Sequence, residues 1–343
     1  MERNARRYDA ADYRNLHGSV IVQEVAGTEI GVRRFDGVDD ASAFFARELD
    51  YIKAQAYDKL FPELSSLRYM PITSDVPEGA ETATWYGYEP TGMAEIIANY
   101  ADELPRADVK GEPNTSHIKS LGVSYGYNAQ EMRASVYTGK NLDARKATAA
   151  RRANDQAVNK IAFMGSGKDN LVGLFSDAAG IPEFTLSEVD VNSVKHTEFK
   201  YKTADQILED LNNMQAYIDK LTNSIERPDT LALPSHIFMD LSTRRIPDTQ
   251  ITILAFLKEN SPYINNFESW NELSAEATLF NPTNKNVAFL YTKDPEKFSL
   301  ELPMQFKQYP VQVKNLETVI PCESRCAGLM IYYPLSMLLA KGI

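Results

Sequence analysis

The amino-acid sequence predicts an α+β protein with a long strand-rich arm, and three consecutive segments carry this prediction. A segment of strand-type alternation, at about residues 82–125, precedes a short helical segment, 129–137, and an alanine-rich helix, 141–163. A strand-rich loop of that length does not fit inside a compact domain. We therefore expect an arm that leaves its own subunit and pairs with another, so that the chain assembles.

Size and composition limit the class of protein. The chain has 343 residues, which suits one large or two medium domains. A hydrophobic content of 43% and a charged content of 24% are ordinary for a soluble globular protein with a core of useful size. The net charge of -11 argues against tight, sequence-independent nucleic-acid binding by the whole surface, but it is compatible with a local basic face.

The cysteines, histidines and chain ends give no sign of a metal, a secretion signal or a membrane span. Two cysteines, Cys322 and Cys326, make no disulfide framework, and four histidines form no Cys/His cluster, so we expect no metal and no cofactor. Residues 1–7 lack the apolar region of a signal peptide. The apolar segment 327–340 contains Pro334 and is shorter than the ~20 residues that span a bilayer, so we expect a buried terminal strand.

The N-terminal third contains a predicted hairpin and a predicted helix. Residues 1–16 are polar and suit an arm or a frayed helix. Residues 20–25 and 29–35 alternate about Ala26-Gly27-Thr28, which indicates a hairpin. Asp39 and Asp40 are candidate N-caps for a helix with apolar residues at helical spacing, which Pro62 ends.

The predicted ribbon carries aromatic residues on both faces. Side chains alternate across a strand, so Trp85 points to one face while Tyr86 and Tyr88 point to the other. We expect all three residues to make contacts between subunits. A turn is predicted at residues 90–92, further breaks at 104–105 and 111–114, and a returning strand at 117–127.

The alanine-rich helix is the strongest secondary-structure prediction. Asn141 is a plausible cap, and alanine, which has the best helix propensity and permits close packing, recurs along the segment. We expect one continuous helix that is the longest or second longest in the chain, with Ala150 and Ala153 in close contacts. Beyond it we predict helices at 204–225, 237–244 and 249–259, and strands at 231–233, 287–291, 298–306, 311–319 and 328–333.

Three motifs that suggest catalysis have simpler interpretations. Residues 165–168 (Gly-Ser-Gly-Lys) follow a helix, whereas a phosphate-binding loop precedes one, so a helix C-cap and turn is favoured. Cys322 and Cys326 have three residues between them instead of the two of a redox pair, which favours two reduced thiols in a loop. Ser235-His236 has neither a nucleophile elbow nor a placed aspartate. We therefore expect no catalytic residues.

One basic cluster lies on the alanine-rich helix, formed by Arg145, Lys146, Arg151 and Arg152. The simpler interpretation is a solvated helix face, because acidic residues lie nearby. The functional interpretation is a weakly cationic surface that faces packaged nucleic acid or another subunit.

The order of these elements resembles the major capsid proteins of tailed phages, which share the Hong Kong 97-type fold with encapsulins. Residues 80–99 and 122–127 resemble the extended loop of that fold, and residues 128–133 and 139–143 resemble the approach to its spine helix. Gly173-Leu174-Phe175 resembles a short turn of the family, and residues 332–335 resemble the last strand of the peripheral domain.

The resemblance implies four parts. These are an N-terminal arm, 1–38; a peripheral domain, 39–71, 128–202 and 317–343; an extended β loop, 72–127; and an axial domain, 203–316. It further implies hexamers and pentamers that tile an icosahedral shell around double-stranded DNA. Because the chain has no room for a long scaffolding segment, we expect a separate scaffolding protein.

The resemblance also implies a location and partners. It places the protein in the virion capsid after synthesis in the bacterial cytoplasm, and adds portal and decoration proteins as partners, weak contact with DNA, no membrane and no enzymatic activity. Some relatives form Lys–Asn crosslinks, but no lysine, asparagine and carboxylate match that reaction here. Two alternatives remain: an encapsulin-like compartment, which residues 1–35 disfavour, and a soluble α+β enzyme, which would need a pocket of converging polar groups.

Overall fold

The computed structural model describes residues 20–25, 28–34, 63–93, 106–138 and 142–343, which belong to two units divided between Phe61 and Pro62. In the first unit, β1 (Val20–Val25) and β2 (Thr28–Arg34) form the antiparallel hairpin predicted from sequence. The helix predicted after Asp39 lies outside the described residues. All further statements concern the second unit, residues 62–343.

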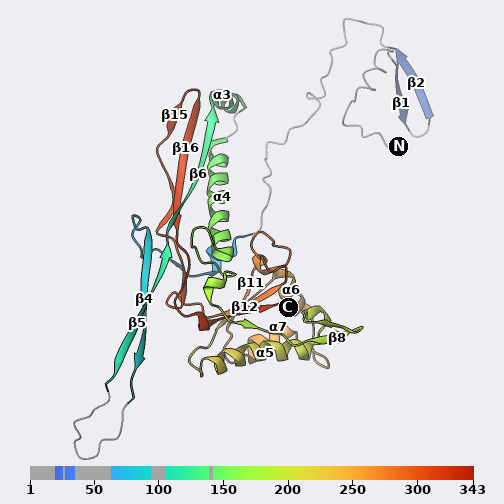
Figure 1. The fold of residues 1–343 in the computed structure, drawn as a ribbon. Coiled ribbons are helices and arrows are strands. Elements are labelled where there is room, and N and C mark those ends of the chain that lie inside the picture. Colours follow the sequence, from blue (N-terminus) through green and yellow to red (C-terminus); the bar gives the residue numbers. More distant parts are fainter. Residues whose placement is uncertain (1–19, 26–27, 35–62, 94–105, 139–141) are drawn as a thin grey trace, which may run out of the picture. The chain divides into compact units, whose positions relative to one another are not determined.

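A five-stranded sheet forms the centre of the second unit (Figure 1). Every residue of its inner strands β10 and β12 is buried, because apolar layers cover both faces. Strands covered on both sides are expected to be continuously apolar, which matches the sequence of both strands. In spatial order the strands are β11 (Asn266–Ser269), β10 (Thr230–Leu233), β12 (Val287–Tyr291), β18 (Met337–Lys341) and β7 (Glu183–Phe184).

Three helices contribute to the core on one face of this sheet: α5 (Ala204–Leu221), α6 (Ser235–Thr243) and α7 (Ile253–Asn260). Helix α5 begins with a capping box between Thr203 and Gln206. It ends four residues earlier than predicted, because Asn223 and Ser224 adopt positive φ angles of 50° and 65° and turn the chain.

The core on the other face includes residues of the long helix α4 (Leu142–Met164), which with 23 residues is the longest helix in the described part of the chain. This confirms the prediction of one continuous helix. Gly165, with φ 67°, ends it, and its N–H donates to the Ile161 carbonyl. The short helix α3 (Ala129–Thr138), also predicted, precedes it.

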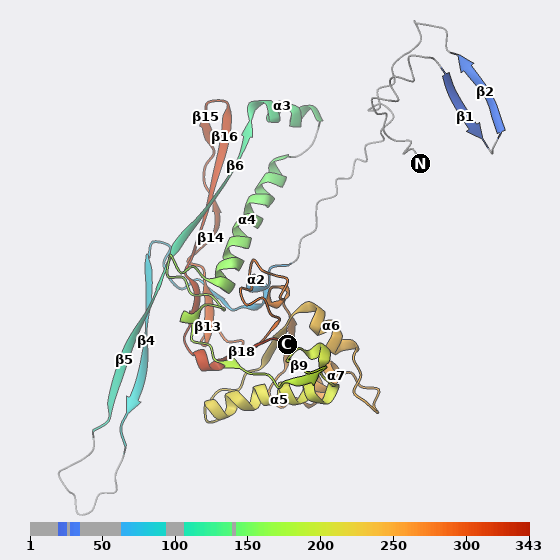
Figure 2. The same cartoon turned by 45° about the vertical axis from the view of Figure 1, so that its right-hand side comes forward.

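A second sheet lies beside α4 (Figure 2). Its central strand β16 (Glu317–Cys326) pairs along its whole length with β6 (Lys119–Asn128) and, on its other edge, with β14 (Met304–Gln308) and β15 (Gln312–Lys314). The strand predicted at 311–319 is therefore two strands joined by a turn. The loop predicted around Cys322 and Cys326 is wrong, since both cysteines lie within β16.

A three-stranded sheet connects the C-terminal region to the start of the arm. Strand β13 (Phe298–Glu301) pairs with β17 (Gly328–Ile331) and with β3 (Ile72–Thr73). The strand predicted at 298–306 is therefore divided between β13 and β14. Residues 327–340 form two strands, β17 and β18, separated by a turn with the 3-10 helix η4 (Pro334–Ser336), and not one terminal strand.

The smaller elements complete the second unit. They are α2 (Ser65–Tyr69), η1 (Asp177–Ala179), β8 (Val189–Val191), β9 (Val194–His196), η2 (Phe199–Tyr201) and η3 (Asn271–Leu273). No helix within the described ranges is long and apolar enough to cross a membrane.

The arm is an antiparallel hairpin of two ten-residue strands, β4 (Thr82–Thr91) and β5 (Asp108–His117). The pairing continues without interruption from Thr82 opposite His117 to Thr91 opposite Asp108. The turn predicted at 90–92 and the break predicted at 111–114 are therefore wrong in the paired part. Pro113 fits because β4 is the only described strand that pairs with β5, and an edge strand can contain a residue without an N–H donor.

Candidate assembly surfaces

The base of the arm is fixed to its own unit by a small apolar cluster. Ile118, Ala327 and Met330 are buried there, with Trp85 and Tyr332 packed against them. The rings of Trp85 and Tyr332 meet edge to face, with centroids 5.5 Å apart. The arm therefore leaves the body from a defined position.

A buried carboxylate holds the chain that enters the arm. The side chain of Glu301, which is 2% exposed, accepts hydrogen bonds from the Thr73 hydroxyl at 2.5 Å and the Val76 N–H at 3.2 Å. On the other strand of the arm, the Ser116 hydroxyl donates to the Ala327 carbonyl at 2.9 Å. The segment that enters the arm and the returning strand β5 are thus both bonded to residues 301–327.

The distal part of the arm is exposed. Tyr86 and Tyr88 are 60% and 69% exposed, and their rings stack on one face of β4 with centroids 6.3 Å apart. Trp85 lies on the opposite face and is only half-exposed because it contacts Tyr332. The structure therefore separates the three predicted contact residues: the two tyrosines are available to another molecule, whereas Trp85 already packs on its own chain.

The four basic residues of α4 do not form one surface. At 100° per residue, Arg145 and Arg152 fall on a similar side of the helix, whereas Lys146 and Arg151 point in two other directions. The Lys146 ammonium binds the Glu131 carboxylate at 2.7 Å and the Gly126 carbonyl at 2.8 Å. The hydrogen bond from Lys146, and after it the one from the Asn128 N–H, lower the pKa of Glu131.

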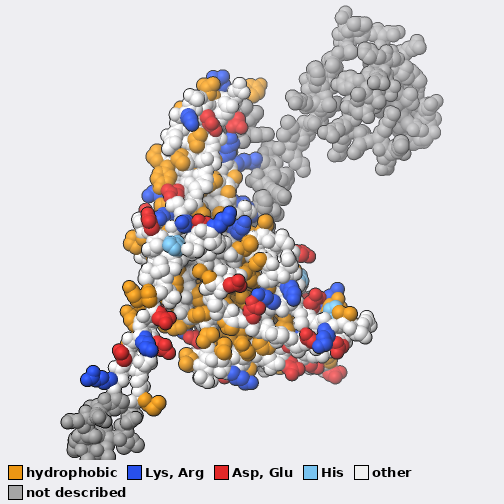
Figure 3. All heavy atoms as spheres, in the orientation of Figure 1, with side chains coloured by type: hydrophobic (Ala, Val, Ile, Leu, Met, Phe, Trp, Pro, Cys, Tyr) orange, Lys and Arg blue, Asp and Glu red, His pale blue; other side chains and the backbone are white. Residues whose placement is uncertain are grey.

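Figure 3 shows both basic and acidic side chains on the visible face of the unit, and no single sign of charge covers that face. Arg145 and Arg151 are exposed, and Lys146 and Arg152 are half-buried. A cationic surface formed by all four residues is therefore not present, and of the four only Arg145 and Arg151 are exposed to a partner outside the described residues.

The alanines of α4 have different surroundings. Ala150 is 4% exposed and Ala162 is fully buried, so both face the interior. Ala153 is exposed, so no part of the chain that the structure describes packs closely on it. The hydroxyl of Ser324 bonds the buried Asn154 side chain at 2.5 Å and so connects α4 to β16.

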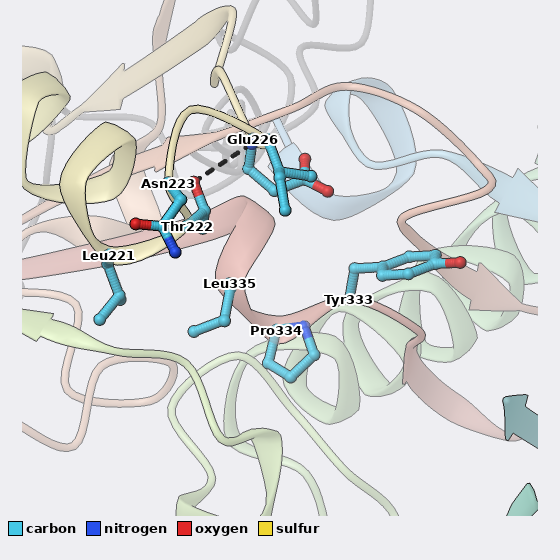
Figure 4. Close-up of a pocket in the computed structure, with 8 residues that line it drawn as sticks. Leu221, Thr222, Asn223, Glu226, Tyr333, Pro334 and Leu335 are labelled. Carbon is cyan, nitrogen blue, oxygen red and sulfur yellow. Dashed lines mark hydrogen bonds between the residues drawn. The ribbon is translucent and has the colours of Figure 1, made fainter. Parts of the chain in front are cut away.

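An apolar groove of about 360 Å³ lies between the end of α5 and η4 (Figure 4). Leu221, Ile225 and Leu335 line it and are 43%, 79% and 43% exposed. Its one carboxylate, Glu226, is bound to Lys297 at 2.6 Å. Sequence reasoning missed this groove, because Ile225 was assigned to the predicted helix and Leu335 to a terminal strand.

The residues considered for catalysis lie in structural settings. The Ser235 hydroxyl accepts a hydrogen bond from the Ser269 hydroxyl at 2.9 Å. Burial raises the pKa of the Cys322 thiol, and it raises that of Cys326 to about 11, so both thiols are poor nucleophiles. No group of three or more metal-ligating side chains occurs in the part of the chain that the structure describes.

The fold defines a class of protein. The chain superposes on the capsid of Myoviridae phage XM1 with a TM-score of 0.74 and 12% sequence identity, covering 89% of this chain and 100% of that chain. Chains from Mycobacterium phage Bobi (TM-score 0.56, 13% identity, 84% and 94% covered) and Gordonia phage Cozz (0.55, 12%, 93% and 98%) are also similar. The α+β architecture is therefore the Hong Kong 97-type capsid fold.

The sequence places the chain within a particular family. Residues 92–343 match the model of the major capsid protein family, and the chain belongs to that family. No curated protein matches it. The protein is a phage major capsid protein, which makes it a structural component of a virion shell and favours this function over an encapsulin-like compartment.

Proposed function

We propose that the protein forms hexamers and pentamers that close an icosahedral phage head around double-stranded DNA. The observation that carries the proposal is the arm, which offers exposed aromatic side chains on a hairpin that pairs with no other strand in the described ranges. A two-stranded hairpin is marginally stable in water unless another surface supports it. In a family of shell-forming proteins, that surface is a neighbouring subunit.

The contact between subunits is heterologous in this proposal. The arm of one copy lies on a different surface of the next, and such head-to-tail contacts close into rings when the rotation between copies permits it. Tyr86 and Tyr88 make the contact, and the Trp85 side chain supports it from the base of the arm.

The DNA contact is weak in this proposal. A net charge of -11 per chain disfavours tight binding of phosphates. The basic cluster Arg145, Lys146, Arg151 and Arg152 lies on or near the inner surface in this proposal, and its exposed members, Arg145 and Arg151, supply a modest local attraction. Portal, scaffolding and decoration proteins are the further partners proposed, with synthesis in the bacterial cytoplasm. The chain acts as a structural protein and not as an enzyme.

The test is to express the chain alone and with its neighbouring phage genes, and to image the products by electron microscopy. Icosahedral shells with hexameric and pentameric units, filled with DNA when the packaging genes are present, are the expected result. Shells that take up a protein cargo and no DNA would support the compartment alternative. A monodisperse monomer under all conditions would contradict both.

A further inference from the structure

We infer that the arm binds a second copy of the chain through one face only, which we call the tyrosine face, while the opposite face fixes the arm to its own subunit. This inference rests on the proposed function, because it specifies which side chains make the contact. The tyrosine face consists of alternate residues of the two strands: Thr82, Thr84, Tyr86, Tyr88 and Pro90 of β4, and Val109, Gly111, Pro113, Thr115 and His117 of β5.

The distal part of the tyrosine face is apolar and carries no charged group. Besides the two tyrosines, it contains Pro90 opposite Val109, which is 58% exposed. Nothing else in the described part of the chain pairs with these strands. An exposed apolar surface of this kind usually marks an interaction site.

The Tyr88 ring packs on Gly111 and stacks with the Tyr86 ring before any partner binds. Tyr86 lies opposite Pro113 and Tyr88 opposite Gly111, so neither ring competes with a long cross-strand side chain. A Cβ atom on Gly111 would be only 3.2 Å from the Tyr88 ring, which shows that the ring lies over the glycine. Aromatic side chains that are already ordered lose little conformational entropy on binding.

The opposite face has a different composition. Near the base it carries Trp85, which packs on Tyr332, and the buried Ser116, which bonds to Ala327. Further out it carries exposed charged residues: Glu89 lies opposite Lys110, and Glu112 lies opposite Gly87. One face is thus occupied by its own subunit or by solvated charges, whereas the distal part of the other face is apolar and is not covered by any described residue.

The net charge of the chain bears on the identity of the molecule that binds the tyrosine face. Each chain has a net charge of -11, so two copies approach each other against a repulsive field. The opposite face carries one cation, Lys110, and three carboxylates, Glu89, Asp108 and Glu112. A contact through it would therefore bring net negative charge to another acidic chain, and like charges at an interface are costly. The uncharged tyrosine face avoids this cost, which favours a second copy as its occupant.

Hydroxyl-radical footprinting of the wild-type protein, before and after assembly, tests this inference directly. In purified shells made from this chain alone, oxidation of Tyr86 and Tyr88 should fall about tenfold or more relative to unassembled subunits. Oxidation of Trp85 should change much less, because Tyr332 contacts it in both states.

A matched pair of double variants separates the two faces at the same distance along the arm. Y86S/Y88S should raise the subunit concentration needed for shell formation about tenfold or more, because aromatic residues are typical interface hot spots. E89S/E112S should assemble like the wild type. Circular dichroism and thermal unfolding of the unassembled subunits check that both variants are folded.

The outcomes distinguish this inference from the proposed function. Wild-type protein that forms no shells contradicts the proposed function and the inference together. Shells in which the tyrosines remain as reactive as in free subunits, or in which E89S/E112S alone prevents assembly, contradict only the choice of face. Protection that appears only when a second phage protein is added would identify that protein, and not another copy, as the occupant.

Discussion

Gly173 lies so close to Gly165 that a Cβ atom on Gly173 would be 2.2 Å from the Gly165 nitrogen. The same position would be 2.8 Å from the Ile161 carbonyl oxygen, so the turn after α4 packs backbone on backbone. The N–H groups of Leu174 and Phe175 donate to the carbonyls of Ala162 and Phe163, each at 2.8 Å. The turn therefore satisfies the last carbonyls of the long helix.

Replacing Gly173 by alanine should destabilise the subunit by about 1–3 kcal/mol or more, because the added methyl meets backbone atoms that cannot move separately. Urea unfolding of the unassembled subunit measures the change in free energy. Gly167→Ala is the matched control, since a Cβ there has no neighbour within 4 Å. Equal stability of the two variants would contradict the close-contact argument.

The buried carboxylate of Glu272 should stabilise the attachment of residues 65–69. Glu272 is 2% exposed and accepts hydrogen bonds from the Ser65 N–H (2.9 Å), the Ser65 hydroxyl (2.5 Å) and the Asn159 amide (2.9 Å). Glu272→Ala leaves these donors without an acceptor, and an unsatisfied buried donor costs about 1–3 kcal/mol. Glu276→Ala, at an exposed position, should change the free energy of unfolding by less than about 0.5 kcal/mol.

The alanines of α4 allow a test within one helix. Ala150→Leu should destabilise the unassembled subunit by about 1–3 kcal/mol, because it overpacks a site that is 4% exposed. Ala153→Leu, at an exposed site, should change this stability by less than about 0.5 kcal/mol. The sequence predicted close contacts at both positions, so assembly of the second variant shows whether another copy contacts Ala153.

Stability at high pH should depend on Cys326. Its pKa is raised from 9.0 to about 11 in the folded protein, chiefly by burial, so the unfolded chain loses this proton first as the pH rises. The contribution is fully present below about pH 9 and is lost between about pH 9 and pH 11. Other groups titrate in this range, so the measurement is the difference between wild type and Cys326→Ala, which should shrink as the pH rises. A difference that is constant from pH 8 to pH 11 would contradict the assignment.

The sequence predicted the helices and strands whose formation depends on short-range patterns. The alanine content of 142–164, the alternation of 20–25 and the apolar run 287–291 each fixed an element to within a few residues. The errors arose where tertiary pairing decides. Pro113 was taken as a break, yet it fits an edge strand, and Cys322 was assigned to a loop, yet it lies in β16, which pairs with β6 along its whole length.

The candidate surfaces were harder to predict for the same reason. The tyrosines were visible in the sequence, but Trp85 could not be separated from them without knowing that Tyr332 packs on it from 247 residues further along the chain. The proposed boundaries of the peripheral and axial domains remain a prediction. The pairing of β18 with β12 associates residues 337–341 with the strands at 230–233 and 287–291, and this favours moving that segment to the axial part.

The last prediction concerns which surface of the shell carries the basic residues of α4. A shell must hold DNA without binding it so strongly that packaging or ejection stalls, and each phosphate contact adds salt-dependent affinity. We expect the exposed Arg151 to lie on the inner surface, as part of the basic cluster. Because both native cysteines are buried, Arg151→Cys supplies a single accessible thiol among the described residues. This thiol should react with a large polymer-linked maleimide in free subunits and in opened shells, but not in intact shells. Rapid labelling of intact shells would place it on the outer surface and leave the cluster only the role of a solvated helix face.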